Sequence, residues 1–206
     1  LTSCNGQLSN PKIVTNDFKE QFLKGDTVKE LGSNIMVIYQ DKKNVYWFGS
    51  WETGVYRYDG KTLINYTTKH GLPNNRIDEI KEDKPGNIYF NNGGELIKFD
   101  GQNFIKVSTT SNSNNEWKLE PDDLWFKGNQ NSGLVYRYDG KNLHRLKFPE
   151  TKEGNDYLTK FPNVAYSPYD VYLNYKDSEG NVWFGTAALG VCMYNGKTFT
   201  WLSEKE

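Results

Sequence analysis

The sequence predicts an all-β protein, a small β-propeller of four four-stranded antiparallel blades. Two observations support this fold class. Aromatic residues make up 15% of the 206 residues, with 19 glycines and only 2 methionines, which favours strands and turns over helices. An aromatic residue followed by Asp-Gly or Asn-Gly occurs four times, and the copies are spaced by roughly the length of one propeller blade, about 40 residues.

Each of these dipeptides predicts a β-hairpin, because the two residues of a tight hairpin turn need positive φ angles. The intervals between the four glycines are 41, 39 and 56 residues. The copies are Tyr58-Asp59-Gly60, Phe99-Asp100-Gly101, Tyr138-Asp139-Gly140 and Tyr194-Asn195-Gly196.

A second repeated phrase, rich in aromatic residues, precedes each hairpin. It predicts a strand that is apolar on both faces, as a sheet packed between two other sheets requires. An Asp-containing turn precedes this strand at residues 41–44, 83–87 and 177–181, and a degenerate, shortened version lies at 120–123. The copies of the aromatic phrase are Tyr46-Trp47-Phe48, Ile88-Tyr89-Phe90, Leu124-Trp125-Phe126 and Val182-Trp183-Phe184.

Each unit is therefore predicted to form four antiparallel strands, and in the third unit the first strand is expected at residues 116–119. Residues 1–32 precede the propeller and are expected to hold a tether, with a short helix at 16–25 or a strand within 11–28. The propeller is expected over residues 33–206, with blades at about 33–69, 74–109, 115–148 and 170–204 and an insertion at 149–169.

The four blades are expected to close into a monomeric ring, because an open arc leaves sheet edges bare. The alternative is an open half-ring that pairs with a second copy, which two-fold symmetry would allow.

Three segments resemble the two-component regulator propeller repeat: residues 77–90, residues 176–186, and the link His70-Gly71-Leu72-Pro73-Asn74-Asn75. The resemblance covers about residues 33–204. It implies a periplasmic sensor propeller, and this chain looks like a stand-alone, lipoprotein-like member of the kind found in Bacteroidetes. With four units rather than a dozen or more, and no kinase or DNA-binding segment, the chain departs from the family pattern. The resemblance therefore implies the fold more strongly than a signalling role.

The first four residues, Leu1-Thr2-Ser3-Cys4, resemble a bacterial lipobox, in which the cysteine becomes a lipidated N-terminus. Cys4 is then the expected lipidation site, and the following polar residues are a tether that holds the domain outside the cytoplasm, facing the periplasm or on the cell surface. The alternative is a free cysteine in a disordered arm. The other cysteine, Cys192, lies in a strand-like run and is expected to be a small buried side chain.

Charge and hydropathy exclude two function classes. The 25 Lys and Arg residues nearly balance the 26 Asp and Glu residues, so no positive field attracts nucleic acid. No run of 18 apolar residues predicts a membrane-spanning helix.

No catalytic or metal-binding group is predicted. The only two histidines, His70 and His144, fall in a link between blades and after a hairpin turn. No cofactor is expected, and the chain is not expected to be an enzyme. Asp78, Glu79 and Glu82 lie on a strand expected to line the axis, where solvated charges are favoured over a bound cation.

Binding on one face is the favoured function. In a propeller, the links between blades and the loops after the second strands open on the same face, and long aromatic loops are often functional. Exposed Trp or Tyr beside Asn and Gln can stack on a sugar ring and bond its hydroxyls, or anchor a protein partner. The alternative for Tyr166 and Tyr169 is that they pack the insertion against the ring. The candidate ligand-binding residues are Trp51, Glu52, Asn91, Asn92, Asn129, Gln130, Tyr166 and Tyr169.

The sequence thus favours an extracytoplasmic, membrane-tethered propeller that acts as a ligand-binding or protein-interaction module. The alternative is a glycan-sensing component of a two-component type signalling system, and a propeller lyase or hydrolase is the third hypothesis.

Overall fold

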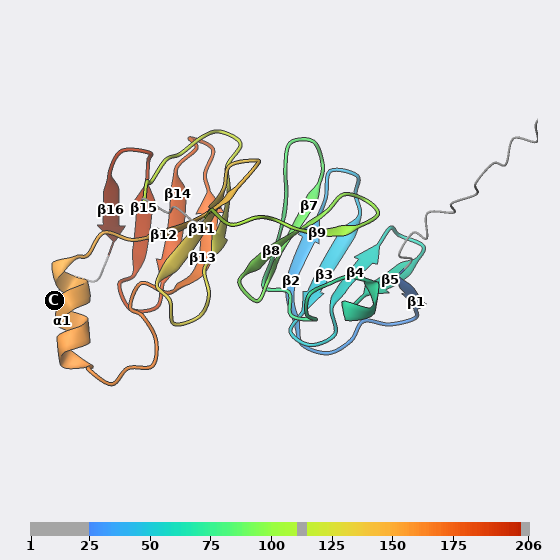
Figure 1. Ribbon diagram of the computed structural model, residues 1–206, viewed down its shortest axis with the longest axis horizontal. Helices are drawn as coiled ribbons and strands as arrows, with labels where there is room; N and C mark the ends of the chain where they lie inside the picture. The colour runs from blue at the N-terminus through green and yellow to red at the C-terminus, as the bar shows by residue number, and fades with distance from the viewer. Residues whose placement is uncertain (1–24, 111–114, 203–206) are drawn as a thin grey trace, which may run out of the picture.

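The computed structural model describes residues 25–110 and 115–202, which form four antiparallel sheets in succession along the chain (Figure 1). In spatial order the first sheet contains β1 (Asp26–Val28), β5 (Leu63–Tyr66), β4 (Val55–Tyr58), β3 (Tyr46–Ser50) and β2 (Ile35–Gln40). The second contains β6 (Glu79–Glu82), β7 (Ile88–Asn92), β8 (Glu95–Phe99) and β9 (Phe104–Lys106). The third contains β10 (Leu124–Lys127), β11 (Leu134–Tyr138) and β12 (Leu143–Lys147), and the fourth β13 (Val171–Lys176), β14 (Val182–Thr186), β15 (Val191–Tyr194) and β16 (Phe199–Leu202).

The repeated Asp-Gly and Asn-Gly hairpins form as expected, but the two turn residues do not both adopt positive φ angles. Gly60 has a φ angle of 91°, whereas Asp59 is not among the described non-glycine residues with positive φ. Asp59 instead accepts hydrogen bonds through Oδ1 from the main-chain N–H groups of Lys61 (3.1 Å) and Thr62 (2.9 Å). The glycine supplies the left-handed conformation and the aspartate caps the turn.

Each sheet packs face to face on the next, and the apolar cores lie between sheets. Trp47 of the first sheet, for example, lies 5.6 Å between ring centroids from both Phe90 and Phe99 of the second. Two further clusters fill the spaces between the second and third sheets and between the third and fourth. The strands nearest the common axis are β2, β6, β10 and β13, because side chains from or next to all four line one central cavity.

The expected closed ring of four-stranded blades is not what the structure shows. The four sheets do not close, and the first and fourth sheets point toward opposite ends of the molecule (Figure 1). The first sheet also gains a fifth strand, because β1 pairs with β5. The third sheet has three strands rather than four.

The missing strand of the third sheet is the one expected at residues 116–119, which is not a strand. Trp117 of this segment packs instead on Trp125 and Phe148, at ring-centroid distances of 5.6 and 5.2 Å, and its Nε1 donates to the main-chain oxygen of Lys147. Packing of the partly buried Trp117 against the core between the third and fourth sheets therefore replaces pairing along β10.

A degenerate turn accounts for this difference. In the first repeat Oδ2 of Asp41 accepts from Nε1 of Trp47 (2.9 Å), six residues later. The same spacing recurs in the second repeat, where Asp83 accepts from the Tyr89 hydroxyl (3.0 Å), and in the fourth, where Asp177 accepts from Trp183 (2.8 Å). In the third repeat Leu119 stands six residues before Trp125, and the buried Nε1 of Trp125 has no hydrogen-bond partner within the described ranges.

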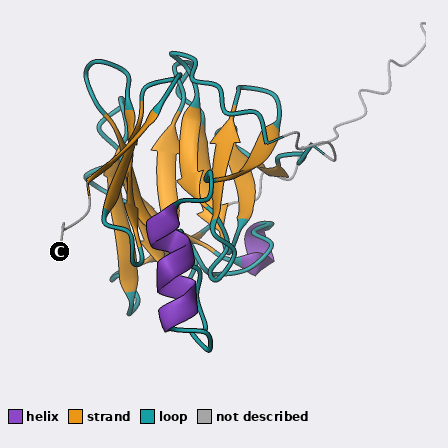
Figure 2. Cartoon of the chain, turned by 90° about the vertical axis from the view of Figure 1, so that its left-hand side faces the viewer, coloured by secondary structure: helices purple, strands orange, loops and turns teal. Residues whose placement is uncertain are grey.

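The insertion contains a helix that the sequence analysis did not predict, α1 (Lys152–Lys160). Thr151 caps it by accepting from the main-chain N–H of Gly154 (3.0 Å). A short 3₁₀ helix (Thr68–His70) lies in the link between the first two sheets. Figure 2 shows both helices at the same end of the strands, which we call the loop face.

The expected tether, the expected helix at 16–25 and the lipidation site Cys4 lie outside the described residues, apart from Gly25, which is not helical. β1 falls within the segment 11–28 in which a strand was expected. In the part of the chain that the structure describes, no helix has the length and apolar character needed to cross a membrane.

Candidate functional site

The loop face carries a pocket of about 140 Å³ where the second, third and fourth sheets meet. Its walls come from the link before β6, the turn between β7 and β8, the loop between β10 and β11, and the start of β13. The lining residues are Arg76, Asp78, Gly93, Gly94, Lys127, Gly128, Asn129, Gln130, Asn131, Tyr166, Asp170, Val171 and Tyr172.

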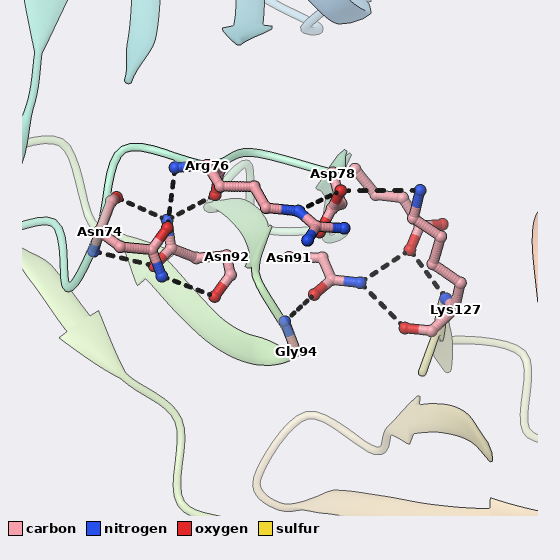
Figure 3. A network of polar contacts seen from close by, with 8 residues as sticks. Asn74, Arg76, Asp78, Asn91, Asn92, Gly94 and Lys127 are labelled. Carbon is pink, nitrogen blue, oxygen red and sulfur yellow. Dashed lines mark hydrogen bonds and ion pairs between the residues drawn. The ribbon is translucent and has the colours of Figure 1, made fainter. Parts of the chain in front are cut away.

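Arg76 is held rigidly at the pocket wall. Its Nε lies 2.9 Å from the Asp78 carboxylate, and its guanidinium carbon lies 3.7 Å from the ring centroid of Trp51. Lys127 approaches the same carboxylate to 3.9 Å (Figure 3). Within the described residues, no protein group accepts a hydrogen bond from the two terminal nitrogens of Arg76. The guanidinium is therefore fixed in place with donors left over for a ligand.

Asn92 is fully buried and holds the link before β6 in place (Figure 3). Its Nδ2 donates to the main-chain oxygens of Asn74 and Arg76, both at 2.8 Å, and its Oδ1 accepts from the N–H of Asn74 (3.2 Å). All of its polar atoms thus serve the chain itself.

Asn91 links the second and third sheets in the same way. Its Nδ2 donates to Oε2 of Glu79 (3.0 Å) and to the main-chain oxygen of Lys127 (2.9 Å), and its Oδ1 accepts from the N–H of Gly94 (3.1 Å). Asn91 therefore positions the pocket wall from beneath.

Asn129 and Gln130 are exposed and line the pocket from the loop between β10 and β11. The side chain of Asn129 lies so close to Gly94 that a methyl group there would overlap its oxygen. Asp170 fixes the end of this loop by accepting from the N–H groups of Asn131 (2.8 Å) and Gly133 (2.7 Å). The pocket is therefore built from amide groups on a turn that a buried carboxylate holds.

Tyr166 also lines the pocket, and its hydroxyl lies 2.6 Å from that of Tyr157 on α1. Tyr169 lies outside the pocket: its hydroxyl accepts from the N–H of Thr151 (2.8 Å) and its ring stacks on Phe148 at 6.1 Å. Glu52 is exposed and does not line the pocket.

Of the eight candidate residues, the structure thus brings three to the pocket wall and places Trp51 behind Arg76. Asn91 and Asn92 lie beneath the pocket, and Glu52 and Tyr169 lie outside it. The positively charged wall residues Arg76 and Lys127 are not among these eight candidates, although Arg76 immediately follows the link motif. The pocket-lining candidates are Asn129, Gln130 and Tyr166.

A second cavity, of about 430 Å³, opens on the axis away from the loop face, next to the open edge of β10. A chain of hydrogen bonds bounds it: Lys81 donates to Oδ1 of Asn174 (2.5 Å), and Nδ2 of Asn174 donates to Oε1 of Glu79 (2.6 Å). Burial lowers the pKa of Lys81, although the Glu79 charge opposes this shift. The cavity is lined by Tyr39, Ile80, Lys81, Glu82, Asp123, Leu124, Trp125, Asn174 and Lys176.

The three acids expected along the axis are engaged by protein groups rather than solvated. Asp78 pairs with Arg76, and Glu79 accepts from side-chain amides and from a main-chain N–H. Glu82 accepts from the Tyr39 hydroxyl (3.3 Å), and burial and the Glu82 charge raise the pKa of Tyr39 to about 12. Within residues 25–110 and 115–202, no group of three or more His, Cys, Asp or Glu side chains is placed to hold a metal ion.

The histidines and the described cysteine are separated by the fold. His70 is buried in the loop-face link, where Nδ1 accepts from the N–H of Thr67 (3.0 Å). His144 pairs with Asp139 at the third hairpin turn (2.6 Å). Cys192 is fully buried, as expected, and burial raises the pKa of its thiol to about 12. A thiol in this state is a poor nucleophile.

Together these features define the class of protein: an arc of β-propeller blades with a polar pocket on its loop face. No family model and no curated protein matches the sequence. Solved structures match its fold. Virginiamycin B lyase from Staphylococcus aureus aligns with a TM-score of 0.62 at 11% identity, over 88% of this chain and 59% of that one.

The extracellular domain of a putative hybrid two-component system from B. thetaiotaomicron aligns with a TM-score of 0.61 at 17% identity, over 86% of this chain and 23% of that one. At these identities the likeness concerns the fold alone, and it agrees with the propeller architecture that the repeats predict. The chain spans little more than half of the lyase and about a quarter of the extracellular domain.

Proposed function

We propose that this chain is an extracytoplasmic binding module, tethered to a membrane by a lipid on Cys4, which binds a polar ligand in the loop-face pocket. The observation that carries the proposal is the arrangement of Arg76, which is fixed by Trp51 and Asp78 while its two terminal nitrogens donate to no group in the described part of the chain. The exposed amides of Asn129 and Gln130 line the same pocket.

The chemistry of this wall fits hydroxyl-rich ligands best. Amide side chains can both donate hydrogen bonds to sugar hydroxyls and accept hydrogen bonds from them, and a guanidinium can donate. Tyr166 and Tyr172 supply exposed aromatic surface on which a sugar ring can stack. The small volume, about 140 Å³, suits one sugar residue rather than a long chain. A glycan end is therefore the favoured ligand, and a polar protein loop is the alternative.

The test is binding to a panel of soluble polysaccharides and oligosaccharides, with affinities measured by calorimetry. The double variant Gln130→Ala/Tyr172→Ala should weaken binding about tenfold or more, because both side chains are exposed at the pocket and make no hydrogen bond to another described residue. Gln102→Ala, in an exposed hairpin turn, is the matched control and should change nothing. Unchanged affinity in the double variant would refute this site.

A sensing role is the second candidate, supported by the likeness to the extracellular domain of a two-component system. In this case ligand binding to the tethered module changes its interaction with a membrane protein, which carries the signal onward. Crosslinking in native membranes, with and without the bound saccharide, tests it: a ligand-dependent crosslink to a membrane protein is expected, and a pattern that ignores the ligand would contradict it.

The proposal does not include catalysis. Incubation of the chain with the same polysaccharides should release no new reducing or unsaturated ends. Turnover above that of a heat-denatured sample would overturn this part and favour a lyase or hydrolase, the third hypothesis.

The lipid anchor is tested separately on the protein from its native membrane. Mass spectrometry of the N-terminal peptide should show a diacylglycerol group on Cys4. An unmodified cysteine would remove the tether from the proposal and leave the pocket unaffected.

A further inference from the structure

The two end sheets of the arc each leave one apolar face bare. Such large exposed apolar side chains, gathered on one sheet face, mark a surface that another protein covers. On the first sheet the exposed residues are Met36 (55% exposed), Ile38 (66%) and Tyr46 (39%). On the fourth they are Leu173 (60%), Tyr175 (63%), Val191 (37%) and Leu202 (56%).

The repeat shows what the bare face of the first sheet matches. Ile38 lies three residues before the turn aspartate Asp41, as Ile80 lies three before Asp83. Ile80 is buried in the core between the first and second sheets. The exposed face of the first sheet is therefore equivalent to the face of the second sheet that packs on the first sheet. In the first sheet, no preceding sheet of the described chain covers this face.

The bare face of the fourth sheet matches the opposite side of that interface. Tyr175 lies two residues before Asp177, as Tyr39 lies two before Asp41, and Tyr39 packs on the core between the first two sheets. The other exposed residues of the fourth sheet are matched in the same way, by counting from the turn aspartate or from the glycine of the hairpin turn. Leu173, Val191 and Leu202 correspond to Val37, Val55 and Tyr66, which all belong to or pack on this core.

The two bare faces are thus the two halves of one more sheet-to-sheet interface. The two faces do not meet within residues 25–110 and 115–202, because the first and fourth sheets point toward opposite ends of the molecule (Figure 1). We propose that a second copy of this chain supplies the missing halves, so that the fourth sheet of each copy packs on the first sheet of the other. Two arcs related by a two-fold axis then make a ring of eight sheets, within the size range of known propellers.

The polar rim supports this pairing as a continuation of the interfaces inside the chain. Between the first and second sheets the Tyr39 hydroxyl donates to Glu82 (3.3 Å). The corresponding pair across the proposed interface is Tyr175 and Gln40, and the amide oxygen of Gln40 can accept the same hydrogen bond without burying a charge. The interface lies between sheet faces, so it does not depend on the loop-face pocket or its ligand.

Analytical ultracentrifugation of the 206-residue chain at micromolar concentrations tests the proposal. The expected mass is about twice the 23.8 kDa of one chain. Ile38→Lys and Tyr175→Glu should each weaken association about tenfold per interface, or about hundredfold for a ring with two interfaces. The double variant, which places opposite charges on the facing sheets, should recover dimer that either single variant loses.

The matched control is Ile105→Lys, because Ile105 is 47% exposed but lies on β9 of the second sheet, away from both end faces. It should leave the mass unchanged. A second measurement does not depend on introduced charges: in a Cys4→Ser background, Gln40→Cys with Tyr175→Cys should be joined between copies by a bismaleimide crosslinker that spans about 10 Å, the usual spacing of sheets packed face to face. A mass of one chain at 100 µM, a ladder of masses above two, or no crosslink would overturn the two-copy ring.

Discussion

The hydrogen bond between Asp41 and Trp47 is the strongest single test of how the repeats are held. Oδ1 of Asp41 accepts from the N–H groups of Lys43 and Val45, and Oδ2 accepts from Nε1 of Trp47, all at 2.9 Å. In Asp41→Asn the amide oxygen can keep the two main-chain bonds, but its NH₂ group then faces the indole N–H. Trp47 is 2% exposed, so water cannot replace the lost acceptor.

The expected cost follows from that geometry. Loss of a hydrogen bond to a charged acceptor, with the buried donor left unsatisfied, costs about 2–3 kcal/mol. With a denaturant dependence of about 3 kcal/mol per M urea, the unfolding midpoint should fall by about 0.7–1 M. Unfolding is followed by tryptophan fluorescence and circular dichroism together, because only coincident transitions justify a two-state free energy.

Two controls separate the indole bond from the change of charge. Asp59→Asn alters a turn aspartate that also accepts from two main-chain N–H groups, but its second oxygen faces a partly exposed Arg57 (3.4 Å) instead of a buried indole, so its midpoint should shift by much less. Trp47→Phe removes the unsatisfied donor, so the double variant with Asp41→Asn should show a coupling of about 2 kcal/mol. Equal shifts for Asp41→Asn and Asp59→Asn, or a coupling near zero, would refute the reasoning.

Three further predictions concern other sites. Gly94→Ala should lower the free energy of unfolding by about 2 kcal/mol or more, because the added methyl group displaces Asn129. In Gly101→Ala the methyl group meets no described neighbour, so the cost should be only that of the left-handed backbone, about 1 kcal/mol. The urea unfolding midpoints of the two variants measure this difference. Glu79→Ala should cost about 3 kcal/mol, because a main-chain N–H and two amide groups lose their acceptor, and a loss below 1 kcal/mol would argue against this network. The third prediction concerns pH: burial raises the pKa of Asp139, but hydrogen bonds from its turn and from an imidazole outweigh this effect and lower it to about 2. Its stabilising contribution is therefore complete above pH 4 and is lost as the pH falls from 3.8 toward 2, so Asp139→Asn should flatten the pH dependence of the urea midpoint in that window.

The hairpins could be predicted because their signal is local. Each glycine after Asp or Asn, such as Gly60, sits between aromatic strands, and turn chemistry alone places the strands on either side. Ring closure could not be predicted in this way. It depends on the sum of the small angles between successive sheets, and no pair of residues in the sequence determines that sum. The pairing of β1 with β5 also joins segments 37 residues apart in register, Thr27 with Ile64, and left no local signal.

The candidate site was harder to predict because amide side chains bind the main chain as readily as a ligand. Asn91 and Asn92 looked like ligand-binding amides in a hairpin loop, yet every polar atom of both is used within the chain. Tyr169 looked like a loop aromatic and packs on Phe148 instead. Burial and partners, which depend on distant sheets, decide the role in each case.

The third repeat departs most from the pattern, and both the loop-face pocket and the axial cavity adjoin it. The main-chain N–H of Gly128 donates to the main-chain oxygen of Leu134 on β11. Main-chain groups of successive residues in a strand point to opposite sides, so those of Lys127 and Trp125 point away from β11, toward the axis. In the other sheets an innermost strand would pair with this edge; here Glu79 and Asn91 satisfy Lys127, and the cavity of about 430 Å³ lies beside Trp125. A repeat that loses its turn aspartate gives up both a strand and an indole hydrogen bond. Natural proteins break such local rules mainly at functional sites, so the third repeat is the place at which the binding proposed above should be tested first.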